Sequence, residues 1–311
     1  MQLLAGWAAL HERAARMIVW GRRLLLASIA VFLVTVLVVL PGYTAYRLLH
    51  PPPCPWSSGS WSVEAEPFTV TASDGVAIHG WVLGPGNEGP VFIVMHDYGS
   101  CLWDPGVRLV AEELARRGYV AVVFDFRGHG SSGGTTTLGV LEVLDAEAVI
   151  GYVASRYPGR SIYLHGYGMG GAVAVMAAAV DARVSGVSAD DPYPTVEAAV
   201  ERWISSHTPL PQSYGWFVAQ WLRVLSGGAV DPGFGPLGLT GGLGGRPLLV
   251  IWETGSPILS RAEAEKIAGL SACSRLVAVK GVGHAEALEK LGVERYAGLL
   301  EWLLHPGCRK G

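Results

Sequence analysis

The segment from Ser161 to Ala178, SIYLHGYGMGGAVAVMAA, restricts the fold of this chain more than any other stretch. An apolar run that begins at Ile162 is followed by a cluster of glycines and then by a run rich in Ala and Val. This order predicts a strand, a sharp turn at Gly166, Gly168 and Gly170, and a helix. Neither element has a polar face, so both must be buried in a layered domain.

Strand-like runs alternate with helical patterns from Pro67 onward. We predict eight strands in a mostly parallel sheet flanked by helices, because strands that are apolar throughout are buried on both faces. The first two form an antiparallel hairpin across the turn dipeptide Asp74-Gly75. The expected strands are 67–73, 76–84, 91–96, 120–126, 161–166, 184–190, 247–252 and 275–281.

An uncharged apolar run, Leu24 to Leu40, precedes this domain. Its length is at the lower limit for a membrane-spanning helix, and Trp20 and Tyr43 are placed to lie at the two interfaces. A buried core helix would show a polar face, and a cleaved signal peptide would have a cleavage site close by. We favour an uncleaved N-terminal anchor over these two alternatives.

The charges beside the apolar run predict its orientation. Four arginines precede it and one follows closely: Arg13, Arg16, Arg22 and Arg23, then Arg47. The positive-inside rule therefore places the N-terminus in the cytoplasm and the main domain outside. The expected divisions are a cytoplasmic segment 1–23, a transmembrane anchor 24–40, a Pro/Ser/Gly-rich linker 41–66 and a globular domain 67–311.

The alternation of strands and helices lapses between about 192 and 246. We predict that this segment is a small lid over the carboxyl edge of the sheet, where α/β folds bind ligands. Its aromatic residues pack within the lid in the simplest interpretation, and contact a ligand in the alternative. They are Trp203, Tyr214, Trp216, Phe217 and Trp221.

Composition excludes some classes of function. The formal net charge is −3, and no basic stripe with interleaved aromatics is present, so no nucleic-acid partner is expected. The spacing of Cys54, Cys101, Cys273 and Cys308 matches no metal site, and we expect no metal and no cofactor. Free thiols are the default expectation for these cysteines, with one disulfide as the alternative.

Several motifs in order give the chain a family resemblance. Phe124 to Gly134, FDFRGHGSSGG, is similar to a D-x-R-G-x-G-x-S loop, and His165 to Gly171, HGYGMGG, is similar to an H-G-x-S-x-G-G elbow. GVGH, ending at His284, precedes the last helical region. Residues from about 67 to 305 thus resemble a membrane-anchored bacterial α/β-hydrolase of the serine aminopeptidase-like and esterase-like branch. The resemblance implies the α/β-hydrolase fold and a Ser–His–acid triad in that chain order.

The nucleophile of that triad is missing here. The resemblance places the base at His284, but the nucleophile position is Gly168, which has no side chain with which to attack a carbonyl. Glycine can still adopt the strained backbone of the elbow. The turn is therefore expected to remain while the hydroxyl is lost.

The acid loop and the oxyanion loop also depart from the family pattern. Aligning the loop IWETGSPIL on Pro257 places the acid at Gly255 or Ser256, neither of which has a carboxylate, and Glu253 is expected to lie too near the strand end to reach the imidazole. Asp190 or Asp191 is the possible substitute.

By analogy with the family, the oxyanion donors are the N–H groups of Tyr98 and Met169. The adjacent Asp97 would oppose a developing negative charge unless its carboxylate points away.

Three functions follow from these departures. The favoured one is a membrane-anchored pseudohydrolase that binds a small apolar or acyl ligand through the lid. The alternative is an active hydrolase of esters, amides or acyl lipids that uses a non-standard nucleophile, for example Cys101 as a thiolate beside His284. The third is a silent domain retained for assembly. A protein partner stays open in each case.

Overall fold

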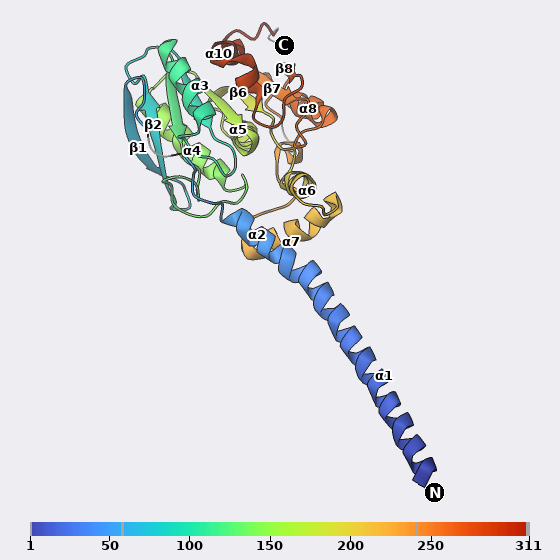
Figure 1. Cartoon of the computed structure of the whole chain (residues 1–311). Helices are drawn as coiled ribbons and strands as arrows, with labels where there is room; N and C mark the ends of the chain where they lie inside the picture. The colour runs from blue at the N-terminus through green and yellow to red at the C-terminus, as the bar shows by residue number, and fades with distance from the viewer. Residues whose placement is uncertain (1, 57–58, 240–241, 309–311) are drawn as a thin grey trace.

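The structure is a computed structural model that describes residues 2–56, 59–239 and 242–308. Its centre is one sheet with the strand order β1-β2-β4-β3-β5-β6-β7-β8 (Figure 1). Strand β2 pairs antiparallel with β1 and β4, and the remaining pairs are parallel. The predicted eight strands and the antiparallel hairpin are confirmed, and the sheet is mixed because β2 runs against its neighbours. The strands are β1 (Ala65–Thr71), β2 (Ala77–Leu83), β3 (Val91–Met95), β4 (Val120–Phe124), β5 (Ile162–Tyr167), β6 (Val184–Asp190), β7 (Leu248–Glu253) and β8 (Ser274–Val279).

Helices cover both faces of the sheet, as the apolar strands require. In β3, Ile93 and Met95 belong to one hydrophobic core, while Phe92 and Val94 belong to the other, because successive side chains point to opposite faces. The first core lies under α4 (Glu142–Arg156), α5 (Gly168–Val180) and α8 (Arg261–Ala268); the second lies under α3 (Pro105–Arg116), α9 (Ala287–Leu291) and α10 (Val293–Leu300). These helices cover the faces of the sheet and leave its carboxyl edge, where α/β folds bind ligands, free of them.

The segment predicted as a lid contains helices α6 (Val196–His207) and α7 (Gly215–Leu225) with short 3₁₀ turns at Gln212–Tyr214 and Pro236–Gly238. Thr195 caps α6 by accepting a hydrogen bond from the N–H of Ala198. The two helices pack against each other and extend toward the N-terminal helix (Figure 1). Residues 240 and 241 of this segment lie outside the described part of the chain.

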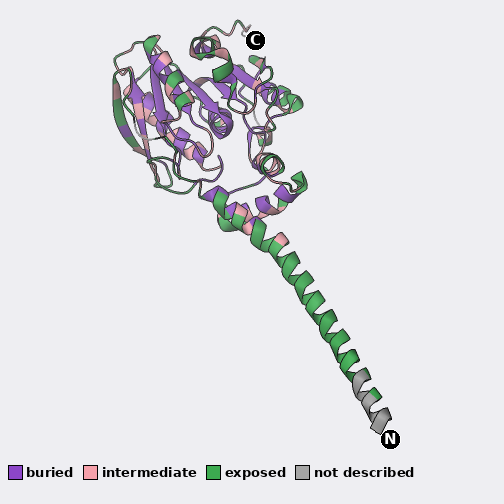
Figure 2. Ribbon diagram, viewed as in Figure 1, coloured by how far each residue is buried: buried purple, intermediate pink, exposed green. Residues whose placement is uncertain are grey.

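One helical rod extends from the globular part. It comprises α1 (Gln2–Val34), a π-helical turn (Thr35–Val39) and α2 (Leu40–Leu49) without interruption (Figure 1). Among the described residues it is the one helix long and apolar enough to cross a membrane, and most of its residues from 11 to 40 are exposed (Figure 2). A span and a signal sequence both meet that description. Residues 41–49, predicted as linker, are instead helical because Pro41, Ala45, Leu48 and Leu49 bury an apolar stripe against the domain.

The cysteines form two disulfides, Cys54–Cys101 and Cys273–Cys308. The expectation of free thiols was wrong, because segments that are far apart in sequence are neighbours in the fold. The first bond ties the segment after α2 to the loop that follows β3, and the second ties the start of β8 to the C-terminal region. Cys101 therefore has no thiolate to offer to His284.

We predict that removing the first disulfide destabilises the folded protein. A cross-link that closes a loop of 47 residues restricts the unfolded chain, and its loss is expected to lower the free energy of unfolding by about 2–4 kcal/mol. Cys54→Ser with Cys101→Ser, made in the full chain and melted in detergent, should unfold at a lower temperature than the parent. An unchanged melting temperature, with both thiols reactive in the parent under denaturing, non-reducing conditions, would contradict the bond.

Candidate active site

The turn between β5 and α5 has the geometry of an elbow. Gly168 has φ +48°, in the left-handed region that glycine adopts most readily. Gly170 approaches the backbone carbonyls of Met95 and His96 so closely that a Cβ atom would collide with them. The turn therefore presents position 168 at the carboxyl edge of the sheet, as the sequence predicts, with no side chain on it.

The carboxylate of Asp97 lies in the space that a side chain at Gly168 would need. Its Oδ1 accepts hydrogen bonds from the N–H groups of Tyr98 and Met169, both at 2.7 Å. Its Oδ2 lies 2.8 Å from Nε2 of His284. We call this arrangement the carboxylate bridge. It places an anion on both of the expected oxyanion donors, and a Cβ atom added to Gly168 would collide with it.

His284 lies between two carboxylates. Its Nδ1 is 2.6 Å from Oδ2 of Asp191, and its Nε2 faces Asp97. Burial lowers the pKa of the imidazole, but the charge of Asp97 and the hydrogen bonds to both carboxylates outweigh it and raise the pKa to about 11. At neutral pH the ring is an imidazolium that donates from both nitrogens, so it has no lone pair with which to accept a proton.

The pKa of Asp97 shifts in the opposite direction. Burial raises the pKa of this carboxyl, but the nearby imidazolium and the two N–H donors outweigh burial and hold it below its usual value. The bridge is thus a charged pair with hydrogen bonds to both oxygens of Asp97, the form in which a partly buried carboxylate is stabilised.

The structure brings Asp191, rather than Asp190, to the imidazole. Asp190 ends β6 and accepts a hydrogen bond from the hydroxyl of Tyr296 on the other side of the strand. Asp191 is the next residue, so its side chain leaves the strand in the opposite direction, with φ +43°. Ser256, at the vacated acid position, donates its hydroxyl proton to Asp191. The acid is therefore supplied from the end of β6.

Glu253, which we expected to lie too near the end of β7 to reach the imidazole, lies close to His284. It is fully buried, and its Oε1 accepts a hydrogen bond from the N–H of Ala287. Asp191, Glu253 and His284 each offer one ligand atom within 4.8 Å of the others, the one such group among the described residues. A cation there would face an imidazolium whose two nitrogens are already hydrogen-bonded, so the donor set is poorly suited to a metal.

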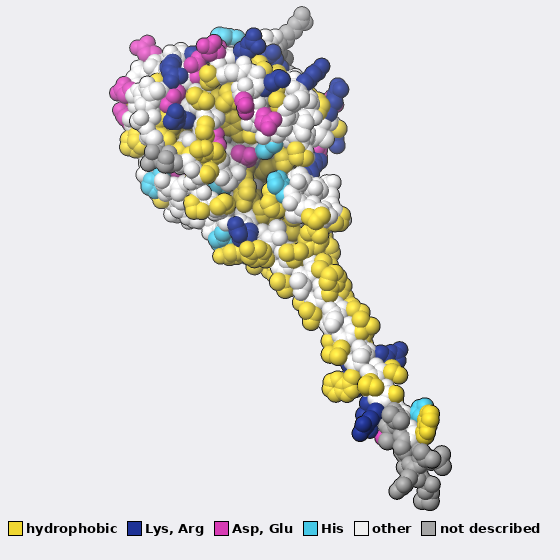
Figure 3. Space-filling model, in the orientation of Figure 1, with side chains coloured by type: hydrophobic (Ala, Val, Ile, Leu, Met, Phe, Trp, Pro, Cys, Tyr) yellow, Lys and Arg dark blue, Asp and Glu magenta, His cyan; other side chains and the backbone are white. Residues whose placement is uncertain are grey.

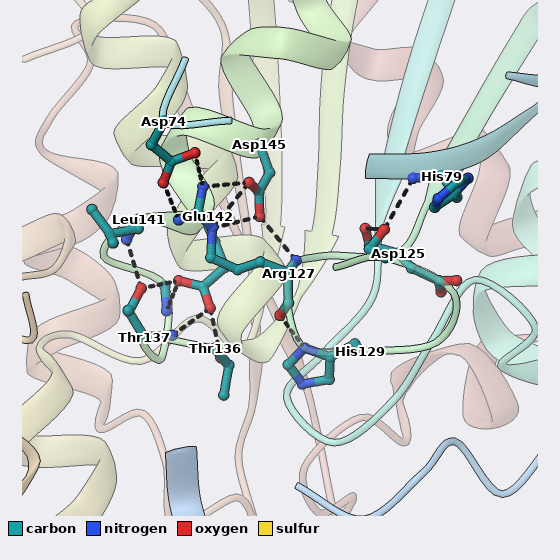
Figure 4. Close-up of polar contacts among 12 residues, drawn as sticks. Asp74, His79, Asp125, Arg127, His129, Thr136, Thr137, Leu141, Glu142 and Asp145 are labelled. Carbon is teal, nitrogen blue, oxygen red and sulfur yellow. Dashed lines mark hydrogen bonds and ion pairs between the residues drawn. The ribbon is translucent and has the colours of Figure 1, made fainter. Parts of the chain in front are cut away.

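A buried network holds the loop after β4 and, through it, the bridge. Arg127 pairs with Asp145 at 2.7 Å and with Asp74 at 2.6 Å, and Glu142 accepts hydrogen bonds from Thr136 and Thr137 (Figure 4). The side chains of Arg127 and Asp145 are almost completely buried, so each requires the other as its counter-charge.

The same loop reaches the site through two side chains. His129 Nε2 accepts a hydrogen bond from the N–H of Gly99 at 3.1 Å, and Asp125 accepts one from the N–H of Leu102 at 2.8 Å. These bonds fix the backbone on which Asp97 stands. His129 is a structural residue here.

A cavity of about 360 Å³ opens beside the bridge. Asp97 and His284 form one end of it, and most of its remaining wall is apolar. Trp203 and Val200 of α6 line one side, and Leu48, in the last turn of α2, lines another. The volume and lining suit a small apolar ligand.

Known proteins resemble this chain in the same region. Residues 93–203 match the family described as serine aminopeptidase, S33. An esterase of Pyrococcus furiosus, Pf2001, has the same fold, with a TM-score of 0.65 at 24% identity, over 83% of this chain and 97% of that one. The chain therefore has the α/β-hydrolase fold.

Two further proteins resemble this chain. An alpha-beta serine hydrolase homologue from Coxiella burnetii superposes on this hydrolase-fold chain with a TM-score of 0.52 at 18% identity, over 78% of this chain and 98% of that one. A curated relative, the uncharacterized protein YfhR of Salmonella typhimurium, is 33% identical over 120 residues. That match covers 36% of this chain and 40% of the length of YfhR.

We predict that His284 stays protonated well above pH 7 and that Asp97→Asn lowers its pKa. The asparagine can keep the hydrogen bonds to Tyr98 and Met169 but removes the charge that stabilises the imidazolium, leaving Asp191, Glu253 and Asp190 as the carboxyls nearby. NMR titration of ¹⁵N-histidine-labelled protein should therefore move the His284 transition toward neutral pH in the variant. A parent transition near pH 6.5 would contradict the bridge.

The same pair makes stability depend on pH. Because the pKa of His284 is raised, its contribution is complete below about pH 6.5 and is lost as the pH rises toward 11. Because the pKa of Asp97 is lowered, its contribution is complete above about pH 4 and is lost in more acidic solution. The difference in melting temperature between the parent and Asp97→Asn should therefore be greatest between about pH 4 and about pH 6.5.

Proposed function

We propose that this chain is a membrane-anchored pseudohydrolase that binds a small apolar or acyl ligand and does not carry out serine-triad hydrolysis. The carboxylate bridge is the observation that supports it. An anion already accepts from the Tyr98 and Met169 N–H groups, the position that should carry a nucleophile is Gly168, and the base is an imidazolium. Acyl transfer needs a nucleophile, an unprotonated base and free oxyanion donors, and this site offers none of the three.

The strained backbone around the cavity supports a ligand-binding role rather than a site that has lost all function. Three non-glycine residues among those described have positive φ, and all three lie at the site: Leu138 in the cavity wall, Asp191 beside the imidazole and Ala285 directly after His284. Such backbone strain persists where the surrounding structure holds it in place. The apolar wall favours a hydrocarbon ligand over a sugar or a peptide.

Two features support anchoring with the domain outside the cytoplasm. The N-terminal helix has a mean hydropathy of 2.9 over its most apolar window, and arginines gather on its N-terminal side. Two disulfides are expected in an oxidising compartment and are rare in the cytosol. The domain boundaries 1–23, 24–40 and 67–311 stay part of this proposal.

The bridge and the missing hydroxyl should block catalysis together. Gly168→Ser alone brings a side chain into the space of Asp97, and Asp97→Gly alone frees the oxyanion donors without supplying a nucleophile. The double variant offers a hydroxyl, a neutral base and the acid Asp191. We expect it to hydrolyse a p-nitrophenyl ester at least about a hundredfold faster than the parent, since positioned general-base catalysis contributes that much or more.

Fluorophosphonate labelling of the same four proteins provides the control. The double variant should be labelled at position 168, and the parent and both single variants should not. Labelling of a native serine in the parent would overturn the pseudohydrolase proposal. Full activity of Gly168→Ser alone would contradict the steric conflict with Asp97.

A second candidate is a hydrolase with Asp97 as nucleophile. The carboxylate occupies the place of the missing side chain, and Asp97 borders the cavity. It could displace the leaving group from an alkyl halide or open an epoxide, forming an ester at Oδ2. The neutral ester would lower the pKa of His284, and the ring would pass its Nε2 proton to the alkoxide of an opened epoxide or, after displacement of a halide, to solvent. The neutral ring would then take a proton from a water that attacks Cγ, while Tyr98 and Met169 hold the Oδ1 anion. As the Cγ–Oδ2 bond breaks, the imidazolium would protonate the departing alkoxide to give an alcohol, and the new carboxyl of Asp97 would return its proton to His284.

Mass spectrometry separates the two candidates. The full chain is incubated with 1-bromohexane or 1,2-epoxyhexane in H₂¹⁸O, and the peptide that contains Asp97 is isolated. A nucleophilic carboxylate would gain ¹⁸O after turnover, and His284→Ala would accumulate the alkyl ester. The pseudohydrolase proposal expects neither change, and ¹⁸O in Asp97 would replace it with the second candidate.

A further inference from the structure

The lid helix α7 packs against the apolar N-terminal helix rather than only against the domain. The hydroxyl of Tyr214, directly before α7, donates a hydrogen bond to the carbonyl of Val36. A Cβ atom built on Gly42 would lie 3.5 Å from the ring of Trp221. Helices α2 and α7 lie side by side (Figure 1).

These contacts fix the level of α7 along the rod. Val36 lies inside the uncharged run that ends at Leu40, and Gly42 lies two residues beyond it. A helix rises about 1.5 Å per residue, so α7 is level with the last few ångströms of that run. A bilayer that surrounds residues 24–40 would therefore reach α7 at its surface.

The exposed face of α7 is largely apolar, as expected for a helix at the surface of a bilayer. Trp216, Val224 and Leu225 are 49%, 65% and 44% exposed. Between Trp203 and Val230 the chain carries one residue with a formal charge, Arg223. Hydrophobic side chains cover the rod between its basic N-terminal part and the globular part, and they continue onto the end of the globular part from which the rod emerges, whereas most acidic side chains lie farther away (Figure 3).

The cavity reaches the last turn of α2, farther along the rod than the contacts with α7. Leu48, eight residues beyond Leu40, lines the cavity, and its carbonyl accepts a hydrogen bond from the hydroxyl of Tyr98 at 3.0 Å. Eight helical residues span about 12 Å, somewhat more than the roughly 5–8 Å that one headgroup layer adds to the hydrocarbon core. Exposed Tyr43 and Tyr46 lie between the two levels, where aromatic side chains anchor at an interface.

We propose that α7 lies in the surface of the bilayer that the N-terminal helix enters, and that the cavity takes a single-chain acyl lipid directly from that leaflet. The occupant of the exposed α7 face is the membrane itself, because the apolar surface of α7 is continuous with the apolar surface of the rod. The part that concerns the cavity rests on the proposed ligand-binding function. The part that concerns α7 rests only on the proposed membrane anchor.

Photolabelling tests the position of α7. The full chain is reconstituted in vesicles of phosphatidylcholine and phosphatidylglycerol that contain a phosphatidylcholine with a diazirine in its acyl chain. After irradiation, adducts are expected on the peptide that spans Trp216 to Leu225. Val180, at the opposite end of the sheet and 63% exposed, is the matched control and should stay unlabelled. Labelling confined to the rod, or cross-links between the α7 helices of two copies, would overturn the proposal.

Ligand transfer tests the route into the cavity. cis-Parinaric acid is supplied either from vesicles or as a dilute aqueous monomer, and its fluorescence is excited by energy transfer from tryptophan, with Trp203 in the cavity wall. Val224→Asp should slow loading from vesicles at least fivefold and leave loading from water unchanged. Val180→Asp should change neither rate.

The two tests fail in distinguishable ways. Absence of parinaric acid binding from either source would refute the proposed function and the cavity route, and photolabelling would still decide where α7 lies. Binding with equal loading rates in Val224→Asp and the parent would leave the proposed function standing and overturn entry from the leaflet.

Discussion

The Asp97 carboxylate is the group on which the site depends. It satisfies two backbone donors that have no partner in the vacated elbow, and it converts His284 into a cation. Without it, the N–H groups of Tyr98 and Met169 would lose their acceptor and His284 would lose one of its two carboxylate partners, and unpartnered polar groups cost free energy. The site is therefore a closed set of mutual contacts rather than a catalytic centre from which one atom is missing.

The sequence predicted the fold well because the fold depends on local regularities. Apolar strands and the glycine turn at 166–170 determine the sheet and the elbow, and both follow from patterns a few residues long. The helix continues to Leu49, beyond the predicted anchor, because of an apolar stripe whose partner is the distant α7. The disulfides were missed for the same reason, since spacing does not reveal which loops become neighbours.

The site was predicted in part. Gly168 and His284 follow from their places in motifs, but the direction of a side chain at a strand end does not. Asp190 and Asp191 are equivalent in sequence, and only the alternation of side chains at the end of β6 distinguishes them. Asp97 stood out as an acid where glycine is usual. Only the structure shows that its carboxylate enters the space of the absent serine. The sequence did contain a signal, because Asp97 and Gly168 are both unusual for the family and belong to loops that meet at the elbow.

The hydrogen bond between Tyr98 and the last turn of α2 has a mechanical consequence. Leu48 belongs both to the last turn of α2 and to the cavity wall. A tilt of the rod relative to the globular domain would therefore change the opening of the cavity. Spanning helices adjust their tilt to the thickness of the surrounding bilayer. If the N-terminal helix spans a membrane as proposed, the thickness of that membrane would therefore change the width of the cavity without any change in the residues that line it.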